Sequence, residues 1–315
     1  MTKLRALIGL IFIAILVYCG LWYTAAFKAE KTTARELADL RDKGLKVEHG
    51  KIKLSGFPYR IVLTIDGIGV KTRGPGMEFG ADSVTLISHL WTPGHWMMEG
   101  RNVVASFADD AVAFKDGYMR ASYKRHADKQ AVIVVDSYKT DDFVLEAAPA
   151  LEKPQSLKEW QLYLRYDGTA EPTDGLYEKR FLDFKLVMDS GNRLELMGGV
   201  MGPPLFDWTR GALGAWRDAG GLLELDSIDI AVRGARVKGN ASLTLDENFM
   251  PLGSASLAIA GGPALADYLT SLGFEDASSL TEMGSQAESL SVMAQMGQLN
   301  IGSSPVAMLE PIIDE

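Results

Sequence analysis

The chain begins with a long apolar run and then alternates between apolar and polar positions. Residues 6–27 carry no charge, and at ~1.5 Å per helical residue they extend about 33 Å. The hydrocarbon core of a bilayer is ~30 Å thick, so this run predicts a membrane-spanning helix. Trp22, Tyr23 and Phe27 stand where an aromatic belt would meet the far interface.

A cleaved signal peptide is the alternative interpretation, with Thr24-Ala25-Ala26 as a small-residue processing site. We favour a retained anchor, because the apolar run exceeds the ~7–15 residues usual in a signal peptide. A lipoprotein is disfavoured, because the bulky Tyr18 precedes Cys19. An N-terminal charged-then-apolar segment favours a cytoplasmic N-terminus. We therefore expect a single-pass protein of the bacterial inner membrane, with membrane contact through residues 4–27 and the bulk of the chain in the periplasm.

The next segment changes from apolar to charged without losing its helical character. Residues 28–43 are rich in Lys, Glu and Arg, with Leu37 and Leu40 on one side, and Gly44 is a typical helix stop. We expect residues 28–44 to form a helical stalk that holds the domain away from the bilayer, with residues 1–27 as the anchor.

After Gly44 the apolar positions recur at every second residue, which is typical of strands. Turn signals such as Gly74-Pro75-Gly76 and Ser190-Gly191-Asn192 separate many of the runs. The fold class that follows is mainly β with some α: a long, twisted antiparallel meander, either an open groove or a sandwich, covered by a few helices. The runs that predict strands most clearly are Leu45–Val47, Ile52–Leu54, Ile61–Ile65, Asn102–Phe107, Tyr118–Tyr123, Ala131–Asp136, Phe143–Glu146, Trp160–Tyr166, Phe181–Met188, Leu222–Val232, Val237–Leu245 and Ser254–Ile259.

Two stretches depart from the strand pattern. Residues 205–219 follow Pro203-Pro204 and have a helical apolar stripe that ends at Gly220-Gly221. Residues 263–296 predict two further helices, and Gln298–Ile301 predicts a last short strand. We therefore expect a β-rich domain over residues 45–262, closed by a helical segment with a terminal strand over residues 263–315.

Charge and motifs argue against several kinds of function. The net charge is −9 and no basic block occurs, which disfavours nucleic acid and electrostatic docking to anionic lipid. His89 and His95 flank a turn without metal-ligand spacing, and the common nucleophile and phosphate-binding motifs do not occur. We expect no catalytic residues, no metal and no cofactor, and hence no enzyme.

Two groups of residues are candidates for contact with a ligand or a partner. In Ser55–Arg60, Gly56 and Pro58 predict a kink at the entry of a strand, and Phe57, Tyr59 and Arg60 would line a ligand mouth or simply pack on the sheet. In the helix over residues 205–219, Trp208 and Trp216 would cap the sheet or present an aromatic face to a partner.

Several of these features together resemble a bacterial envelope family, mainly alphaproteobacterial, known as domain of unknown function 2125 (DUF2125). They are the N-terminal anchor, the stalk, Gly56–Arg60 leading into IVLTID, Val237–Asp246 running into PLGSASLAIAG, and the closing GQLNIGSSPVAMLEPI. The resemblance implies no activity and no catalytic residues. The expected fold is also similar to AsmA-like envelope proteins, whose long sheets curl into grooves and are associated with lipid movement between membranes.

These observations leave three hypotheses for the function. The first is a membrane-anchored, β-rich binding or scaffold protein of the envelope that binds lipid or another apolar ligand. The second is an accessory subunit that docks another envelope protein through its aromatic helix and C-terminal region. The third, which we favour least, is an envelope hydrolase whose catalytic residues are too dispersed to recognise in the sequence; a cleft that brings His89, His95 and an acid together would favour it. A continuous apolar surface on the sheet would favour the first.

Overall fold

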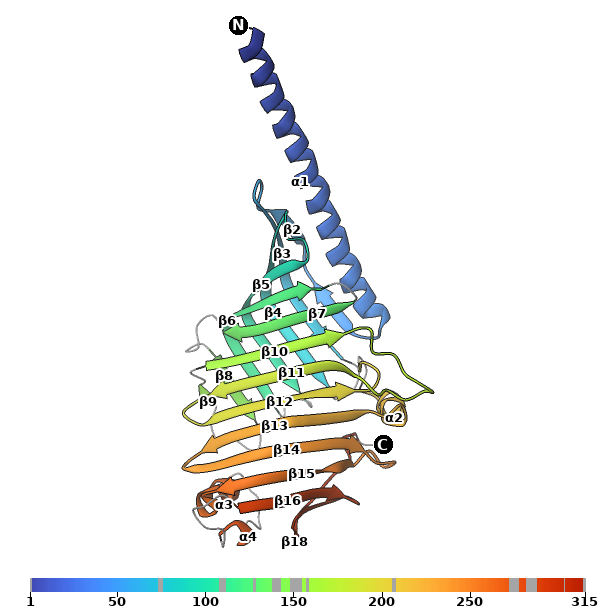
Figure 1. Ribbon diagram of the computed structural model, residues 1–315, viewed down its shortest axis with the longest axis vertical. Coiled ribbons are helices and arrows are strands. Elements are labelled where there is room, and N and C mark those ends of the chain that lie inside the picture. Colours follow the sequence, from blue (N-terminus) through green and yellow to red (C-terminus); the bar gives the residue numbers. More distant parts are fainter. Residues whose placement is uncertain are drawn as a thin grey trace.

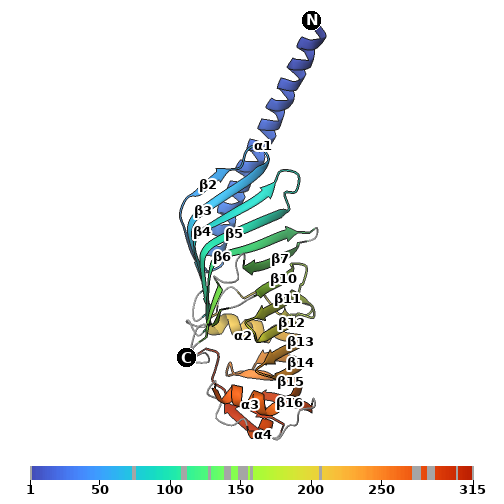
Figure 2. The same ribbon diagram turned by 90° about the vertical axis from the view of Figure 1, so that its left-hand side faces the viewer.

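The structure is a computed structural model. It consists of one long helix and one large sheet with short helices against it (Figures 1 and 2). The structure describes residues 2–72, 76–107, 112–126, 129–137, 143–147, 155–156, 159–205, 208–271, 278–281, 288–302 and 304–313.

The elements follow one another as a meander. The helices are α1 (Thr2–Asp42), α2 (Arg210–Asp218), α3 (Gly262–Ser271) and α4 (Ser278–Thr281). The strands are β1 (Lys46–His49), β2 (Ile52–Ser55), β3 (Arg60–Lys71), β4 (Met77–His89), β5 (His95–Phe107), β6 (Val112–Arg125), β7 (Gln130–Ser137), β8 (Phe143–Ala147), β9 (Gln155–Ser156), β10 (Glu159–Asp167), β11 (Arg180–Asp189), β12 (Arg193–Met201), β13 (Leu222–Val232), β14 (Ala235–Leu245), β15 (Pro251–Ala260), β16 (Glu288–Gln295), β17 (Gln298–Ile301) and β18 (Ser304–Met308).

Helix α1 combines a free half with a half that packs on the sheet. Its apolar side chains up to Leu21 are mostly exposed, and it is long and apolar enough to cross a membrane. From Trp22 onward one side is buried, with Trp22, Ala26 and Leu37 against the sheet. The segment expected as a stalk therefore lies along the domain instead of holding it away. The helix ends as predicted, and Gly44, with a φ of 100°, donates its N–H to the Arg41 carbonyl.

All strands belong to one antiparallel sheet, which confirms the predicted fold class. The main ladder runs from β3 through β7, continues from β10 through β18, and is open rather than closed into a barrel. Strands β1 and β2 both pair with β3, at the end of the sheet nearest α1. Figure 2 shows the consequence, with β2–β6 on one side and β7–β16 on the other.

A line of irregular positions crosses β3–β6, and the sheet divides beside it. The pairing of β3 with β4 passes from Asp66–Ser83 directly to Ile68–Ala81, around Gly67 with its φ of 54°. Across the neighbouring strands, Asn102 has a φ of 47° and donates to the Asp82 carboxylate at 2.6 Å. On one side of this line β6 pairs with β7 through residues 119–125, and on the other side it pairs with β8 through residues 112–116. The irregular line lets the strands change direction where the sheet branches.

Three helices pack on the same face of this sheet. Helix α1 covers Ile61 and Ile65, α2 covers Leu245, and α3 covers Val237 and Ile259. Register places these strand residues on one face, which we call the apolar face. The opposite face, the polar face, carries most of the charged residues, whereas the buried Asp116 pairs with Val103 on the apolar side. One face of the sheet is therefore mainly apolar and the other is solvated.

Two of the predicted helices have different boundaries. Residues 205 and 208 pack beside α2 without belonging to it, because the Thr209 side chain caps the helix by accepting from Ala212 N. The second helix predicted within residues 263–296 is wrong at its end, since Glu288–Gln295 forms β16 and pairs with β15. Residues 282–287 of this predicted helix lie outside the described residues. The last strand at Gln298–Ile301 is confirmed as β17, and β18 follows it.

Candidate functional site

An uninterrupted row of apolar residues crosses the apolar face from strand to strand. We call it the central row. Because directly paired residues in antiparallel strands point to the same face, the register alone defines it. Its members are Leu63, Leu86, Met98, Ala121, Val135, Leu162, Leu186, Leu196, Ile228, Gly239, Leu257 and Leu290, one each from β3 to β7 and β10 to β16.

The central row connects the part of the sheet under α1 with the far end of the molecule. Leu63 is fully buried between Ile61 and Ile65, the residues against which α1 packs. Eleven inter-strand steps of ~4.8 Å give a path of about 53 Å along the sheet. One leaflet of a bilayer has a hydrocarbon thickness of ~15 Å, so the row is several times longer than the apolar part of a lipid.

Among the described residues, the middle of the apolar face lies outside the clusters that the three helices form with the sheet. Here the side chains are half-buried. We call this region the open stretch. It consists of Leu164, Leu182, Phe184, Leu186, Leu194, Leu196, Leu223, Leu225, Ala241, Leu243 and Ala255.

The polar face of the same strands is organised by ion pairs. Arg165 pairs with Asp183, and Lys185 and Arg193 both reach Glu195, which lowers the pKa of Glu195 through hydrogen bonds from both cations. On the next strands Arg236 donates to both carboxylate oxygens of Asp229 and lowers the pKa of that group. The polar face is therefore a charged surface that is compatible with contact with water.

The densest of these groups surrounds Arg180. Its guanidinium donates to both oxygens of Asp226 at 2.7 Å and to Glu224 at 2.7 and 3.0 Å. These bonds lower the pKa of Asp226 and raise that of Arg180. The absence of a side chain at Gly199 makes room for the Arg180 stem. The arrangement holds β11 to β13 on the polar face and contains no nucleophile.

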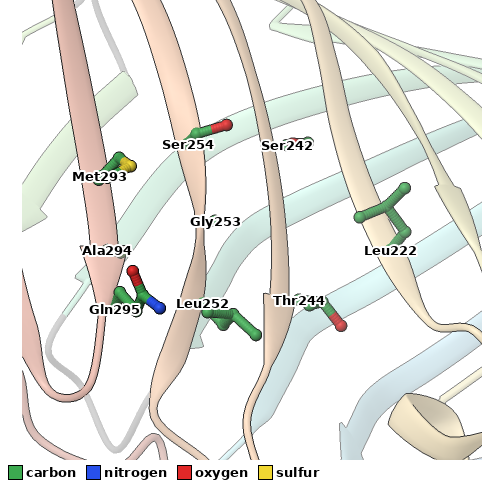
Figure 3. Close-up of a pocket in the computed structure, with 9 residues that line it drawn as sticks. All are labelled: Leu222, Ser242, Thr244, Leu252, Gly253, Ser254, Met293, Ala294 and Gln295. Atoms are coloured by element: carbon green, nitrogen blue, oxygen red, sulfur yellow. The ribbon is translucent and has the colours of Figure 1, made fainter.

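A shallow depression of about 330 Å³ also lies on the polar face, over β13–β16 (Figure 3). Ser242, Thr244 and Ser254 are among its lining residues, with Met293 and Gln295 at its side. These side chains are small or flexible, and none of them is a buried polar group directed at a ligand. The sequence predictions did not include this depression. None of its described lining residues carries a charge.

The sequence-predicted residues Phe57, Tyr59 and Arg60 lie at the end of the sheet beside α1. The Phe57 and Tyr59 side chains are 50% and 67% exposed. The Phe57 ring contacts Trp22 at 5.3 Å and stacks on Tyr23 at 6.2 Å between centroids. Trp22, expected in an aromatic belt, is buried and donates to the Arg60 carbonyl instead. These residues form a surface beside the membrane helix, and their contact role stays a prediction.

The other predicted pair, Trp208 and Trp216, lies inside the molecule. Trp216 is 7% exposed and packs with Leu213, Leu245 and Phe249, and Trp208 packs against the same cluster. Their positions favour the capping interpretation of this helix. In this structure Trp216 presents no surface to a partner.

The two histidines do not form a common site. His95 is exposed and its Nε2 lies 3.0 Å from the Ser122 hydroxyl, whereas His89 stacks on Trp91. In the part of the chain that the structure describes, no three His, Cys, Asp or Glu residues come together as metal ligands. The sequence reasoning did not locate the central row and the open stretch, although the alternation in Leu182–Met188 was the signal for them.

Residues 22–301 match the model of a family described as "Uncharacterized protein conserved in bacteria (DUF2125)". The chain therefore belongs to this family. The match begins at Trp22, the first buried residue of α1 among those described. No curated protein and no solved structure matches the chain.

Proposed function

We propose that this member of the DUF2125 family is anchored in the bacterial inner membrane by α1 and binds an apolar, lipid-class ligand on the apolar face of its periplasmic sheet. The observation that carries this proposal is the open stretch. A row of half-buried Leu and Phe side chains is unfavourable in water at about 25 cal/mol per Å² of exposed apolar surface. An acyl chain lying along it would remove that cost.

The position of the anchor supports a membrane lipid as the source of the ligand. The central row begins under the packed half of α1 and leads without a polar member to the open stretch. A lipid leaving the bilayer would meet apolar side chains along this path. The similarity to AsmA-like proteins, which is expected from the sequence and is itself proposed here, would point to the same class of ligand.

Native mass spectrometry of the full chain, extracted from membranes in mild detergent, tests this function. We expect the wild-type protein to retain acyl-chain molecules that the Leu196→Glu variant loses. Met197→Glu is the matched control, because Met197 is the next residue of β12, is 45% exposed and lies on the polar face. Lipid around α1 is common to all three proteins, so equal retention by all three would contradict the proposal.

The proposed orientation has its own test. An alkaline phosphatase fused after Glu315 should be active, since it folds only outside the cytoplasm. Activity of a cytoplasmic reporter at the same position would overturn the periplasmic location. A mature protein beginning near Ala26 would replace the anchor with a cleaved signal peptide.

We propose no catalytic role for the histidines. The double variant His89→Ala and His95→Ala should fold and keep the retained acyl-chain molecules at wild-type levels. A folded double variant that loses an envelope phenotype completely would instead support the hydrolase hypothesis.

A further inference from the structure

The aromatic turns at one end of the sheet lie close to the membrane-spanning half of α1. Strand β3 begins at Arg60, after the turn that carries Phe57 and Tyr59. Strand β4 ends at His89, directly opposite Arg60, so the β4–β5 turn with Trp91 lies at the same end. The N-terminal half of α1 continues beyond this end of the sheet (Figures 1 and 2).

Two hydrogen bonds fix the β2–β3 turn at a defined height on α1. The Tyr18 hydroxyl donates to the Pro58 carbonyl at 2.5 Å, and Trp22 Nε1 donates to the Arg60 carbonyl at 3.0 Å. From Arg5, the last charge before the apolar run, Tyr18 is about 20 Å along the helix and Trp22 about 26 Å. Both heights are less than the ~30 Å of a hydrocarbon core, and a tilt of the helix would reduce them further.

The β2–β3 turn has few groups that would be costly to remove from water at this depth. Residues 56–59 carry no charge, and Pro58 has no N–H to satisfy. The carbonyls of Gly56, Pro58 and Arg60 accept hydrogen bonds from Arg60 N, Tyr18 and Trp22, respectively. Backbone that is already hydrogen-bonded loses little when water is removed, which is the condition for entering a membrane boundary.

The exposed side chains at these turns include several aromatic ones, beside the exposed Ser55, Arg60 and Thr92. Tyr59 is 67% and Trp91 64% exposed. The Phe57 ring stacks on Tyr23 of α1 with centroids 6.2 Å apart, and Tyr23 stacks in turn on Phe27 at 6.3 Å. Tyr and Trp prefer the headgroup region, where the ring meets lipid and the polar group meets water.

We infer that the β2–β3 and β4–β5 turns insert into the outer boundary of the bilayer that α1 crosses, where the headgroups adjoin the hydrocarbon, through Phe57, Tyr59 and Trp91. The edge of the sheet then stands on the membrane surface, and the start of the central row lies next to the bilayer. This inference rests on the anchor of the proposed function and is independent of the proposed ligand.

Depth-dependent quenching in liposomes tests the inference on the full chain. Cys19 is the single cysteine, so a Cys19→Ala background accepts one new label at a time. An environment-sensitive fluorophore is placed on Tyr59→Cys or Trp91→Cys. Quenching is measured separately with a lipid that carries a nitroxide near its headgroup and with one that carries it deep in its acyl chain. Phe12→Cys in the apolar run is the membrane control, and Met296→Cys, 84% exposed on the distant β16–β17 turn, is the water control.

We expect strong quenching at residues 59 and 91 by the headgroup nitroxide and at residue 12 by the acyl-chain nitroxide, and at least a threefold weaker effect of either lipid at residue 296. Quenching at residue 12 with none at 59 and 91 would overturn the insertion and leave the anchor intact. Absence of quenching at residue 12 would overturn the anchor and the inference together. Labels at 59 and 91 that iodide in the water phase quenches as well as it does at 296 would also contradict the inference.

Discussion

The two faces of the sheet between β10 and β16 are built from the same strands and meet their surroundings in different ways. On the polar face, cations and carboxylates from neighbouring strands alternate and pair, as Arg165 does with Asp183 and Arg236 with Asp229. On the apolar face, helices cover the two ends, and the open stretch between them stays half-buried. The charged pairs of the polar face are compatible with contact with water, whereas the open stretch of the apolar face is where we propose that an apolar ligand binds.

The largest expected effect concerns the covered part of the apolar face. Replacing Trp216 with Ala removes a buried ring from the cluster under α2 and should lower the free energy of unfolding by about 3–5 kcal/mol. Trp91→Ala, which removes an exposed ring, is the control and should change it by less than ~0.5 kcal/mol. Urea unfolding of the full chain in detergent measures both. Equal values for the two variants would show that α2 is not part of the core.

A smaller effect is expected where the polar face is most densely paired. Arg180→Gln leaves Glu224 and Asp226 without their cation and should lower the free energy of unfolding by about 1 kcal/mol at neutral pH, because the group is partly exposed to solvent. Arg180 holds the pKa of Asp226 below its ordinary value, so its stabilisation is present above that value and is lost as the pH falls through the folded-state pKa.

The difference between wild type and Arg180→Gln should therefore narrow as the pH falls below about 4, the usual pKa of an aspartate. Urea unfolding at a series of pH values measures this. A difference that stays constant through the acid range would mean that Arg180 acts through packing of its stem and not through the carboxylates.

The smallest effect is expected for a single exposed pair on the polar face. Arg236→Gln removes the partner of Asp229 at a position where the Arg236 side chain is 56% exposed. It should change the free energy of unfolding by less than ~0.5 kcal/mol, and the change should vanish in 1 M salt. A salt-independent loss of more than ~1 kcal/mol would show that the polar face is more than a solvated surface.

Local patterns of apolar residues were sufficient to predict much of the fold. The rest depends on which strands pair with one another. Alternation predicted most strands, but β4, β9, β12 and β18 were not among the predicted runs. In β12, Gly198 and Gly199 interrupt the apolar positions. In β16 the residues Leu290 and Ala294 fit a helical spacing as well as an alternating one, and only the partner strand β15 decides between them. A prediction from local spacing has no access to that partner.

The candidate site was harder to predict than the fold. The unusual composition of Gly56–Arg60 marked the turn, yet its position against Tyr18 and Trp22 depends on residues about 40 positions earlier in the chain. Trp208 and Trp216 pack in one cluster although only Trp216 belongs to α2, and a predicted apolar stripe does not tell a core from a docking face. The central row joins twelve strands through their register, so it exists only once the sheet is assembled.

The most direct test of the contrast between the two faces is photo-crosslinking in living cells at Phe184 and Tyr163. Both are aromatic and lie on the neighbouring strands β11 and β10, with Phe184 in the open stretch and Tyr163 on the polar face. Each is replaced by a photo-reactive phenylalanine in the full chain, with Phe12 in the apolar run as the lipid-facing control. We predict acyl-chain adducts by mass spectrometry at residues 184 and 12 and none at 163. Adducts at residue 12 alone, or equal yields at 163 and 184, would contradict a ligand on the apolar face.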